Sequence, residues 1–512
     1  MRRIHGVFLA ASLVAAGALA DTVTVPTDHA TIQAAIDDVQ GTAGALVWID
    51  SDDTFNEDLT IVDSVAIRAA AGRQPTIRGV GDNTVDVELA GTGGESFELT
   101  GLRLLPFPGA NSSVDVVNVI KDGDQPITVF LDRLTVEDPE SSGAGAVNLR
   151  SAFAATGALN ATIVDSAITL GGTPGQGTSA ITMLEEGSLT VERCSFDISE
   201  SSGEAWDIRG SRGAGIVFEL FDSTVDISSP AGPFSSQVGI FLNDVSATLE
   251  RNVFTLIDEA EGSADGIRTS PGSPGPGNIT IQMRANTFRR VGQPGGRALS
   301  ASPFAGGQVQ LVAINNVIAG MRGFSFNPQG SSPGGPPAPT VNANLANNTI
   351  DGSNGSAISI SGQDGSEITL SITNNLLTNH EGWGISIFPS PGVTLNDSID
   401  NNGYFNNAMG DVQAPLAPGL DALFADPRYV DQAGGDLHLR AGSPAIDRGA
   451  AIPLPLTDRD GNPRIQGAAV DLGAYEAAPV EFEIPVISPL GMLGLGALLA
   501  FAGLLTLRRR AT

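Results

Sequence analysis

The chain has 512 residues, a formal net charge of −30 and one cysteine, Cys194. Its apolar content of 41% excludes a wholly disordered chain, which needs low hydrophobicity together with high charge. A single cysteine excludes a disulfide scaffold and a cysteine-rich metal site. The acidic balance argues against nucleic acid and anionic lipid headgroups as partners, because both bind clusters of Lys and Arg.

The first 20 residues are typical of a secretory signal peptide. Arg2 and Arg3 precede an apolar run, and Ala18 and Ala20 form a small-residue cleavage site before Asp21. An uncleaved N-terminal anchor is the alternative. Residues 1–20 are therefore expected to direct export.

The next segment predicts a short strand at 21–26 and a helix at 30–39. Ile32, Ile36 and Val39 share one face of this helix, which can cover the open end of a stack of strands. Further strands are expected at 45–49, 58–62, 65–69 and 76–78. Residues 31–36 and 54–61 resemble the opening of the pectin-lyase-like superfamily, which implies a right-handed parallel β-helix and no particular activity.

The middle of the chain is one repeat, in which apolar and polar residues alternate around an anchor position. The anchor recurs every 27 to 34 residues, at Leu102, Leu134, Ser166, Cys194, Ser223, Asn252, Asn286, Asn316, Asn348, Asn375 and Asn402. A period of this length predicts a solenoid, and the alternation of two predicts that its unit is a strand. The positions three before and two after the anchor are apolar in every copy, so we expect them to stack as the core.

Two columns of the repeat carry polar residues. From Asn252 onward the anchor is always Asn, whose stacked amides can hydrogen-bond along the solenoid axis and which tolerates the left-handed backbone of a turn. A role as sugar ligands is the alternative. The preceding column is Arg133, Asp165, Arg193, Asp222, Arg251, Ala285, Asn315, Asn347, Asn374 and Asn401. Its alternating signs predict a ladder of ion pairs on one line, with a basic catalytic site as the alternative.

Proline- and glycine-rich stretches lie between the anchors, at 171–177, 271–277, 292–296 and 328–339. They are expected to protrude from the turns as loops. On a β-helix such loops usually carry the function.

Residues 401–476 contain five short motifs, at 425–430, 435–440, 442–447, 457–461 and 471–476. In this order they resemble the choice-of-anchor Q region, which follows β-helices in many bacterial surface proteins. The resemblance implies surface display and no known catalysis.

The C-terminal end follows a linker at 477–483. Residues 486–507 carry no charge and are long enough to cross a bilayer, and Arg508 to Arg510 would hold that end in the cytoplasm. Residues 484–512 resemble the IPTL-type sorting signal of Gram-negative bacteria. This implies transient anchoring in the inner membrane, an exosortase-like processing enzyme as partner, and a destination at the cell surface or outside the cell. A plain membrane anchor is the alternative.

Few residues are candidates for catalysis. Lys121, the only lysine, stands beside Asp122 and Asp124, either as a base or in a solvated turn. Cys194 is interpreted as a buried small residue and not a nucleophile. The histidines left after export are His29, His380 and His438, and no Ser-His-Asp triad is expected.

Metal binding is left open at two places. Asp458, Asp460, Gly461 and Asn462 have the beginning of a Ca²⁺ loop without its closing glutamate, and an Asx turn is the alternative. The group at Asp50, Asp52 and Asp53 lacks ligand spacing. No residue is assigned a catalytic, cofactor-binding or metal-binding role, and Ca²⁺ is the one cofactor left open.

The sequence as a whole predicts an all-β protein, a right-handed parallel β-helix over 21–400 with a short N-terminal capping helix. The first hypothesis is a secreted, surface-displayed, non-catalytic protein that presents loops for adhesion or for binding a polysaccharide or the cell-surface matrix. The alternative is a carbohydrate-active enzyme, a polysaccharide lyase or glycoside hydrolase. An enzyme should show basic and acidic side chains converging in a groove along one sheet.

Overall fold

The computed structural model describes residues 21–478 and 489–508, except 109, 111–113, 139–144, 153–155, 172–178, 200–203, 211–214, 230–237, 259–264, 270, 272–276, 293–294, 331–336, 364 and 454–455. The expected signal peptide, nearly all of the linker, and most of the proline- and glycine-rich loops lie outside the described residues. The chain divides into two compact units, 1–477 and 478–512.

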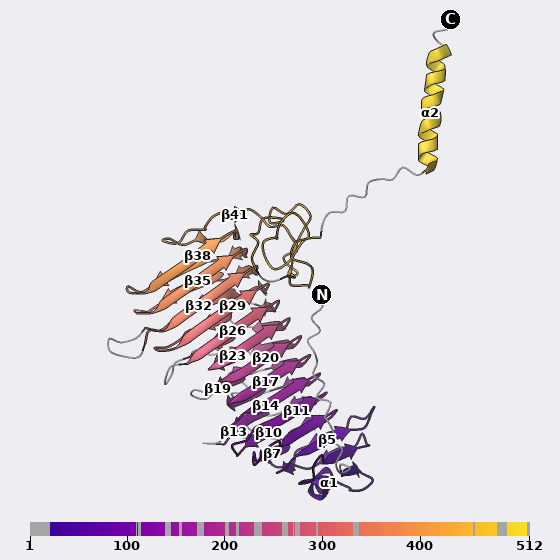
Figure 1. The fold of residues 1–512 in the computed structure, drawn as a ribbon, viewed down its shortest axis with the longest axis vertical. Coiled ribbons are helices and arrows are strands. Elements are labelled where there is room, and N and C mark those ends of the chain that lie inside the picture. Colours follow the sequence, from indigo (N-terminus) through magenta and orange to yellow (C-terminus); the bar gives the residue numbers. More distant parts are fainter. Residues whose placement is uncertain are drawn as a thin grey trace. The chain divides into compact units, whose positions relative to one another are not determined.

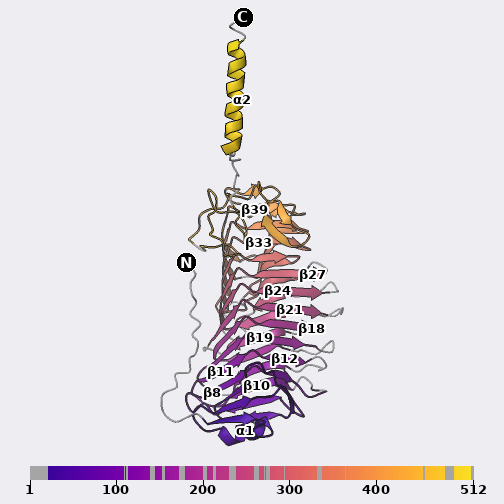
Figure 2. The same cartoon turned by 90° about the vertical axis from the view of Figure 1, so that its right-hand side faces the viewer.

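The first unit consists of three parallel sheets, which we call A, B and C, and each coil of the chain adds one strand to each sheet in turn (Figures 1 and 2). The predicted all-β fold, a right-handed parallel β-helix, is confirmed. Its repeat sets the strand order, because a period near 30 residues brings the same position of successive coils into register.

Sheet A contains β1 (Thr22–Val25), β2 (Leu46–Ile49), β5 (Val65–Ala69), β8 (Ser96–Thr100), β11 (Ile127–Asp132), β14 (Leu159–Val164), β17 (Gly187–Glu192), β20 (Ile216–Phe221), β23 (Val245–Glu250), β26 (Asn278–Arg284), β29 (Gln308–Ile314), β32 (Thr340–Ala346), β35 (Glu367–Thr373) and β38 (Thr394–Asp400). Sheet B contains β3 (Thr54–Asn56), β6 (Thr76–Arg78), β9 (Arg103–Leu105), β12 (Thr135–Asp138), β15 (Ala167–Leu170), β18 (Ser195–Ser199), β21 (Thr224–Ser229), β24 (Val253–Asp258), β27 (Thr287–Gly292), β30 (Val317–Ala319), β33 (Thr349–Ser353), β36 (Leu376–His380), β39 (Gly403–Phe405) and β41 (Leu423–Phe424). Sheet C contains β4 (Leu59–Ile61), β7 (Val85–Leu89), β10 (Asp115–Lys121), β13 (Gly145–Ser151), β16 (Ile181–Glu185), β19 (Glu204–Gly210), β22 (Val238–Asn243), β25 (Asp265–Thr269), β28 (Arg297–Ala301), β31 (Arg322–Phe326), β34 (Ile358–Gly362), β37 (Trp383–Pro389) and β40 (Gly410–Val412).

A short helix, α1 (Ile32–Val39), packs against β1, β2 and β4 and buries the apolar face that the sequence predicts. Thr31 caps its N-terminus by accepting from Ala34 N at 3.2 Å. The carboxylate of Glu57 accepts from Ile32 N at 2.9 Å and from Gln33 N at 3.0 Å. Glu57 therefore ties the capping helix to the next coil, through the helix amides that lack partners of their own. Strand β3 was not predicted.

The core of the β-helix is made by the two predicted apolar columns. Every member of the columns three before and two after the anchor is at most 5% exposed. The prediction of an inward-stacked core is confirmed, because strand alternation sends both positions to the same side of adjoining sheets.

The turn from sheet A to sheet B places its left-handed residue one position before the anchor. Ten consecutive turns, from Arg133 to Asn401, have φ between 49° and 60° at this position. The prediction that the anchor asparagines adopt the left-handed backbone is wrong. The anchor side chain instead points inward, because the residue before it makes the bend.

The anchor asparagines form a buried ladder, as predicted. Asn252, Asn286, Asn316, Asn348, Asn375 and Asn402 are fully buried. Each amide Nδ2 of the first five donates to the Oδ1 of the next asparagine at 2.9 to 3.0 Å. The structural interpretation of these residues is confirmed, since a fully buried amide cannot meet a sugar.

The charged column also lies on one line, as predicted, because the residues before it are in register from coil to coil. Arg193 binds Asp165 in a two-pronged pair at 2.7 and 2.8 Å, and Arg251 binds Asp222 with the same distances. Arg133 instead pairs with its neighbour Asp132 at 3.0 Å. Since the paired side chains are about 40% exposed, each contributes only about 0–1 kcal/mol.

The described residues of 425–477, which follow β41 and which we call the return segment, fold back along the turns of the later coils. They contain one antiparallel pair, β42 (Tyr429–Asp431) and β43 (Asp436–Leu439). A second apolar cluster joins Leu437, Leu439 and Leu472 to Val317 and Leu376 on the outer side of sheet B.

This return segment bonds to two of the asparagines that replace charged residues in the turn column. Asn315 donates to Thr457 O at 2.7 Å, and Asn374 donates to Ala450 O at 2.8 Å. The amide can satisfy the backbone that covers it, whereas a charge would be costly to bury there. Arg and Asp therefore remain where the turn faces solvent.

The second unit contains α2 (Pro489–Arg508). None of the helices in the described part of the chain combines the length and apolarity that a membrane crossing needs. The membrane-spanning helix expected at 486–507 is not supported for that reason.

Candidate functional site

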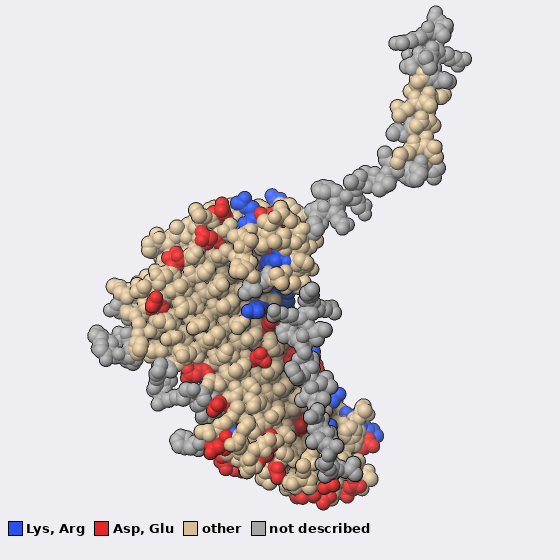
Figure 3. Space-filling model, in the orientation of Figure 1, with Lys and Arg blue, Asp and Glu red and all other residues tan. Residues whose placement is uncertain are grey.

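A shallow groove of about 740 Å³ lies on the outer face of sheet A. It crosses β26, β29, β32, β35 and β38, at right angles to the strands. Figure 3 shows this face as a mostly uncharged expanse over the same strands that Figure 1 labels. A groove that crosses successive coils can hold an extended chain along the solenoid axis.

Two rows of outward side chains line the groove, and the strand register stacks them from coil to coil. One row is Thr280, Gln310, Asn342, Thr369 and Asn396, and the other is Gln282, Val312, Asn344, Ser371 and Ser398. Neighbouring members are about 4.8 Å apart, the spacing of paired strands. Nine of these ten side chains carry a hydroxyl or an amide, so the floor offers repeated donors and acceptors without charge.

The central side chains of the groove are available to a ligand. Among the described residues, no hydrogen bond or ion pair ties down the side chains of Gln310, Asn342 or Asn344, which all reach solvent. Asp397 is the single carboxylate among the described lining residues. A hydrolase needs two carboxylates and a lyase a base near metal-binding carboxylates, so the groove offers binding groups but not those catalytic sets.

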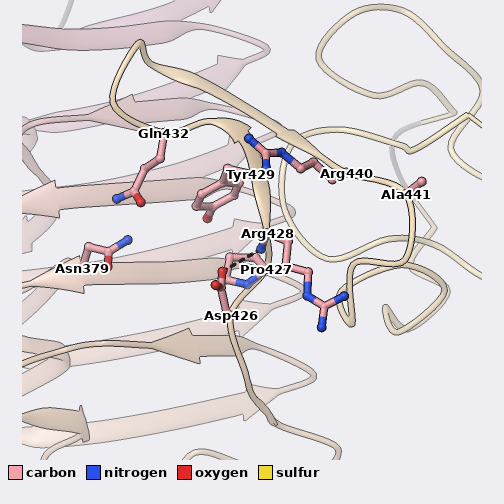
Figure 4. Close-up of a pocket in the computed structure, with 8 residues that line it drawn as sticks. All are labelled: Asn379, Asp426, Pro427, Arg428, Tyr429, Gln432, Arg440 and Ala441. Atoms are coloured by element: carbon pink, nitrogen blue, oxygen red, sulfur yellow. Dashed lines mark hydrogen bonds between the residues drawn. The ribbon is translucent and has the colours of Figure 1, made fainter.

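A smaller pocket of about 270 Å³ lies between the return segment and sheet B. Figure 4 shows Tyr429, Gln432 and Asn379 around it, with the Arg428 side chain directed away from them. Asn379 and Gln432 both donate to the buried carboxylate of Asp351, at 2.7 Å and 3.1 to 3.2 Å. These polar groups bind the return segment to β33 and β36, so the pocket is a seam of the fold.

Lys121 fits neither of its two sequence interpretations. It is fully buried, and its ammonium donates to Thr156 O at 2.6 Å and to Gly123 O. Burial lowers its pKa, with Asp124 opposing the shift. Two backbone carbonyls hold the amine inside the corner after β10, so Lys121 is neither a base facing substrate nor part of a solvated turn.

Cys194 is confirmed as a buried residue. It is 3% exposed, and burial raises the pKa of its thiol to about 11. The thiol faces Glu192 O and Ile163 O at 3.4 and 3.6 Å. A protonated, enclosed thiol has no access to substrate.

Two of the histidines, His29 and His438, pair with nearby aspartates. His29 contacts Asp38 at 3.0 Å beside α1. His438 lies between Asp436 and Asp460, at 2.5 and 2.8 Å. Burial works against its charged form, but the hydrogen bonds to both carboxylates outweigh it, and the pKa of His438 is raised.

The two acidic groups of the sequence are also used within the fold. Asp458 is buried and its Oδ1 accepts from Asp460 N and Asn462 N, at 3.0 and 2.8 Å, which is the Asx turn named as the alternative. Asp50 and Asp52 pair with Arg73 at 3.1 and 2.9 Å. In the described part of the chain, no group of three His, Cys, Asp or Glu side chains is arranged to hold a metal ion.

His380 is buried beside Ser353, whose Oγ lies 2.8 Å from His380 Nδ1. Its Nε2 lies 3.2 Å from the carbonyl of Ile350 and not from a carboxylate, so no Ser-His-Asp triad forms there. Burial lowers the pKa of His380 to about 4.

This shift predicts an acid sensitivity. Between pH 6.5 and 4 the unfolded chain takes up a proton at His380 that the folded protein refuses, so stability is full above pH 6.5 and falls by about 3 kcal/mol toward pH 4. We expect His380→Gln to flatten this part of the pH profile of unfolding, measured by urea denaturation at pH 7, 5.5 and 4. His29→Gln is the control. Equal slopes for His380→Gln and wild type would contradict the prediction.

Sequence reasoning missed the groove residues. The signal was present in the repeat, because the two rows stand six and four positions before the anchors from Asn286 to Asn402. These rows consist mainly of Thr, Ser, Asn and Gln, so they do not stand out as apolar or charged columns.

Comparison with known proteins gives a partial family match and a fold. A family model described as "Disaggregatase related" matches residues 334–452, less than a quarter of the chain. No curated protein matches. The catalytic unit of a thermostable GH87 α-1,3-glucanase from Streptomyces thermodiastaticus superposes with a TM-score of 0.51 at 18% identity, covering 79% of this chain and 72% of that one.

Two further solved structures also match. One is described as pectate lyase Pel9A, with a TM-score of 0.37, 15% identity, and coverage of 73% of this chain and 88% of that one. The other is the Streptococcus pneumoniae surface protein and adhesin PfbA, with a TM-score of 0.37, 13% identity, and coverage of 77% and 95%. At 18% identity, the superposition on the glucanase shows a shared fold and no shared activity.

Proposed function

We propose that this protein is an exported, surface-displayed β-helix that binds an uncharged polysaccharide along the outer face of sheet A without cleaving it. The observation that carries the proposal is the groove floor, with rows of hydroxyl and amide side chains at strand spacing and one carboxylate. Sugar hydroxyls donate and accept hydrogen bonds, and so do these side chains. An extended glycan lying along the axis meets the same pair of positions at each coil.

The proposal differs in one respect from the sequence hypothesis, which placed binding on the loops. The groove lies on the flat sheet itself, where the strands hold the side chains in fixed positions. Such preorganisation reduces the entropy lost on binding.

Affinity electrophoresis in gels that contain neutral α- or β-glucans tests the proposal. We expect at least one neutral glucan to retard the protein. The double variant Asn342→Ala with Asn344→Ala should raise the Kd obtained from the retardation about tenfold, the effect of losing one or two hydrogen bonds. The matched control is Asn160→Ala with Thr162→Ala, at the same two positions of β14, outside the groove.

A reducing-sugar assay on the same glucans, with and without Ca²⁺, distinguishes binding from catalysis. Steady release of reducing ends would overturn the non-catalytic proposal. Equal retardation of both double variants would show that the groove does not bind the glucan.

A further inference from the structure

A second site of unusual chemistry lies at the corner where the chain enters sheet C. Asp265, Arg297 and Arg322 are the first residues of β25, β28 and β31. The parallel register stacks Asp265 on Arg297 and Arg297 on Arg322. Since paired strands are about 4.8 Å apart, the three side chains leave the backbone as one column.

One carboxylate serves this column. Asp265 is 1% exposed and accepts from Arg297 Nη1 at 3.3 Å and from Arg268 Nη2 at 3.0 Å. On the far side of Arg297, the one side chain to which Arg322 donates within the described residues is the neutral amide of Asn354, at 3.4 Å. Among these described residues, three guanidinium groups therefore face one carboxylate, which leaves a local charge of +2.

This excess of positive charge distinguishes the cluster from the paired arginines of the turn column. Arg193 and Arg251 each pair with a carboxylate of the preceding coil, Asp165 and Asp222. Burial, followed by the charge of Arg297, lowers the pKa of Arg322. Arginine nevertheless stays charged in proteins, so the cluster cannot relieve its repulsion by losing a proton.

The cluster is accessible and holds its geometry. Arg268 and Arg297 keep 30% and 29% of their side chains exposed. Arg322 packs over Gly355, where a Cβ atom would clash with its guanidinium, and its buried Nε has no hydrogen-bond partner. Arg297 and Arg322 therefore hold guanidinium donors at strand spacing on one column, next to Arg268.

We propose that Arg268, Arg297 and Arg322 form a binding site for a phosphate dianion, either free phosphate or a phosphomonoester carried by a surface polymer. Guanidinium groups bind tetrahedral oxyanions through paired N–H donors. A dianion neutralises the local charge of +2, whereas a single carboxylate neutralises only half of that charge. The site is on sheet C, so it does not depend on the polysaccharide groove of sheet A.

Calorimetric titration of the full chain with inorganic phosphate at constant ionic strength tests the site. We expect saturable binding, with Kd raised at least tenfold by Arg297→Gln and by Arg322→Gln. Arg251→Gln, which removes an arginine that has its own carboxylate, should leave Kd unchanged. Circular dichroism confirms that each variant is folded.

Two further ligands identify the chemistry and the source. Glucose 6-phosphate binding as tightly as phosphate would support a polymer-borne phosphomonoester, and phosphate binding alone would support the free ion. Glucuronate binding as tightly as phosphate would overturn the dianion assignment. No saturable phosphate binding by the wild type, or binding by both Gln variants as tight as that of the wild type, would overturn the site, whatever the glucan experiments show.

Discussion

Replacing Asn348 by alanine is expected to lower the free energy of unfolding by about 3–5 kcal/mol, because several buried polar groups lose their partners at once. Asn348 Nδ2 donates to Ala313 O at 2.8 Å and to Asn375 Oδ1 at 2.9 Å. Its Oδ1 accepts from Asn316 N and Nδ2, at 3.0 and 2.9 Å. Equilibrium urea unfolding followed by circular dichroism measures the loss.

The matched control is Cys194→Ala, at the anchor position of an earlier coil. This change removes one buried sulfur atom and no amide, so we expect a cost of about 1 kcal/mol. A loss for Asn348→Ala no larger than that of Cys194→Ala would show that the asparagine ladder contributes little to stability.

Replacing Arg464 by leucine is expected to detach the return segment and to cost about 3–5 kcal/mol, as for a buried ion pair that loses one partner. Arg464 is 5% exposed, and it donates to Glu476 Oε1 at 2.8 Å, to Gly473 O at 2.7 Å and to Asn315 Oδ1. It therefore joins the final residues of the return segment to a turn of the β-helix.

Limited proteolysis with mass spectrometry tests this prediction. In Arg464→Leu we expect early cleavage between residues 440 and 476, while the far-ultraviolet circular dichroism of the β-helix is retained. Burial already raises the pKa of Glu476 to about 7. Without Arg464 a charged Glu476 is costlier still, so the destabilisation should be smaller at pH 5, where the carboxyl is protonated.

Arg440→Leu serves as the control for this second prediction. Arg440 lies in the same segment, is exposed, and donates to the carbonyl of Val430. We expect unchanged proteolysis. Equal cleavage of Arg464→Leu and wild type would mean that the apolar cluster around Leu437 and Leu472 holds the segment unaided.

The fold was predictable because it repeats. A single apolar residue three positions before the anchor does not predict burial. The same position is apolar in eleven copies, and this repetition predicts a column of inward side chains. The asparagine ladder followed for the same reason. The left-handed position was misplaced by one residue, because Arg and Asp occupy it in five coils and neither type signals such a turn as clearly as Gly or Asn.

The candidate sites were less predictable. The groove rows are polar without being charged, so they resemble any solvent-facing side of a strand until the register aligns them. Lys121 looked like a surface residue among acidic neighbours, yet it is enclosed by carbonyls from its own corner and from the next coil. Arg297 and Arg322 stand 25 residues apart and form one cluster only because each begins a strand of sheet C.

The sequence by itself determined the β-helix, its inward columns, its capping helix and its asparagine ladder. In-register stacking gives equivalent positions of successive coils the same environment, so the same residue pattern recurs in each coil. Only the tertiary structure decided where the return segment lies, which turn asparagines it covers, and which outward side chains gather into a groove or a cationic cluster. Those outcomes depend on surfaces brought together from distant coils, and no period in the chain encodes them.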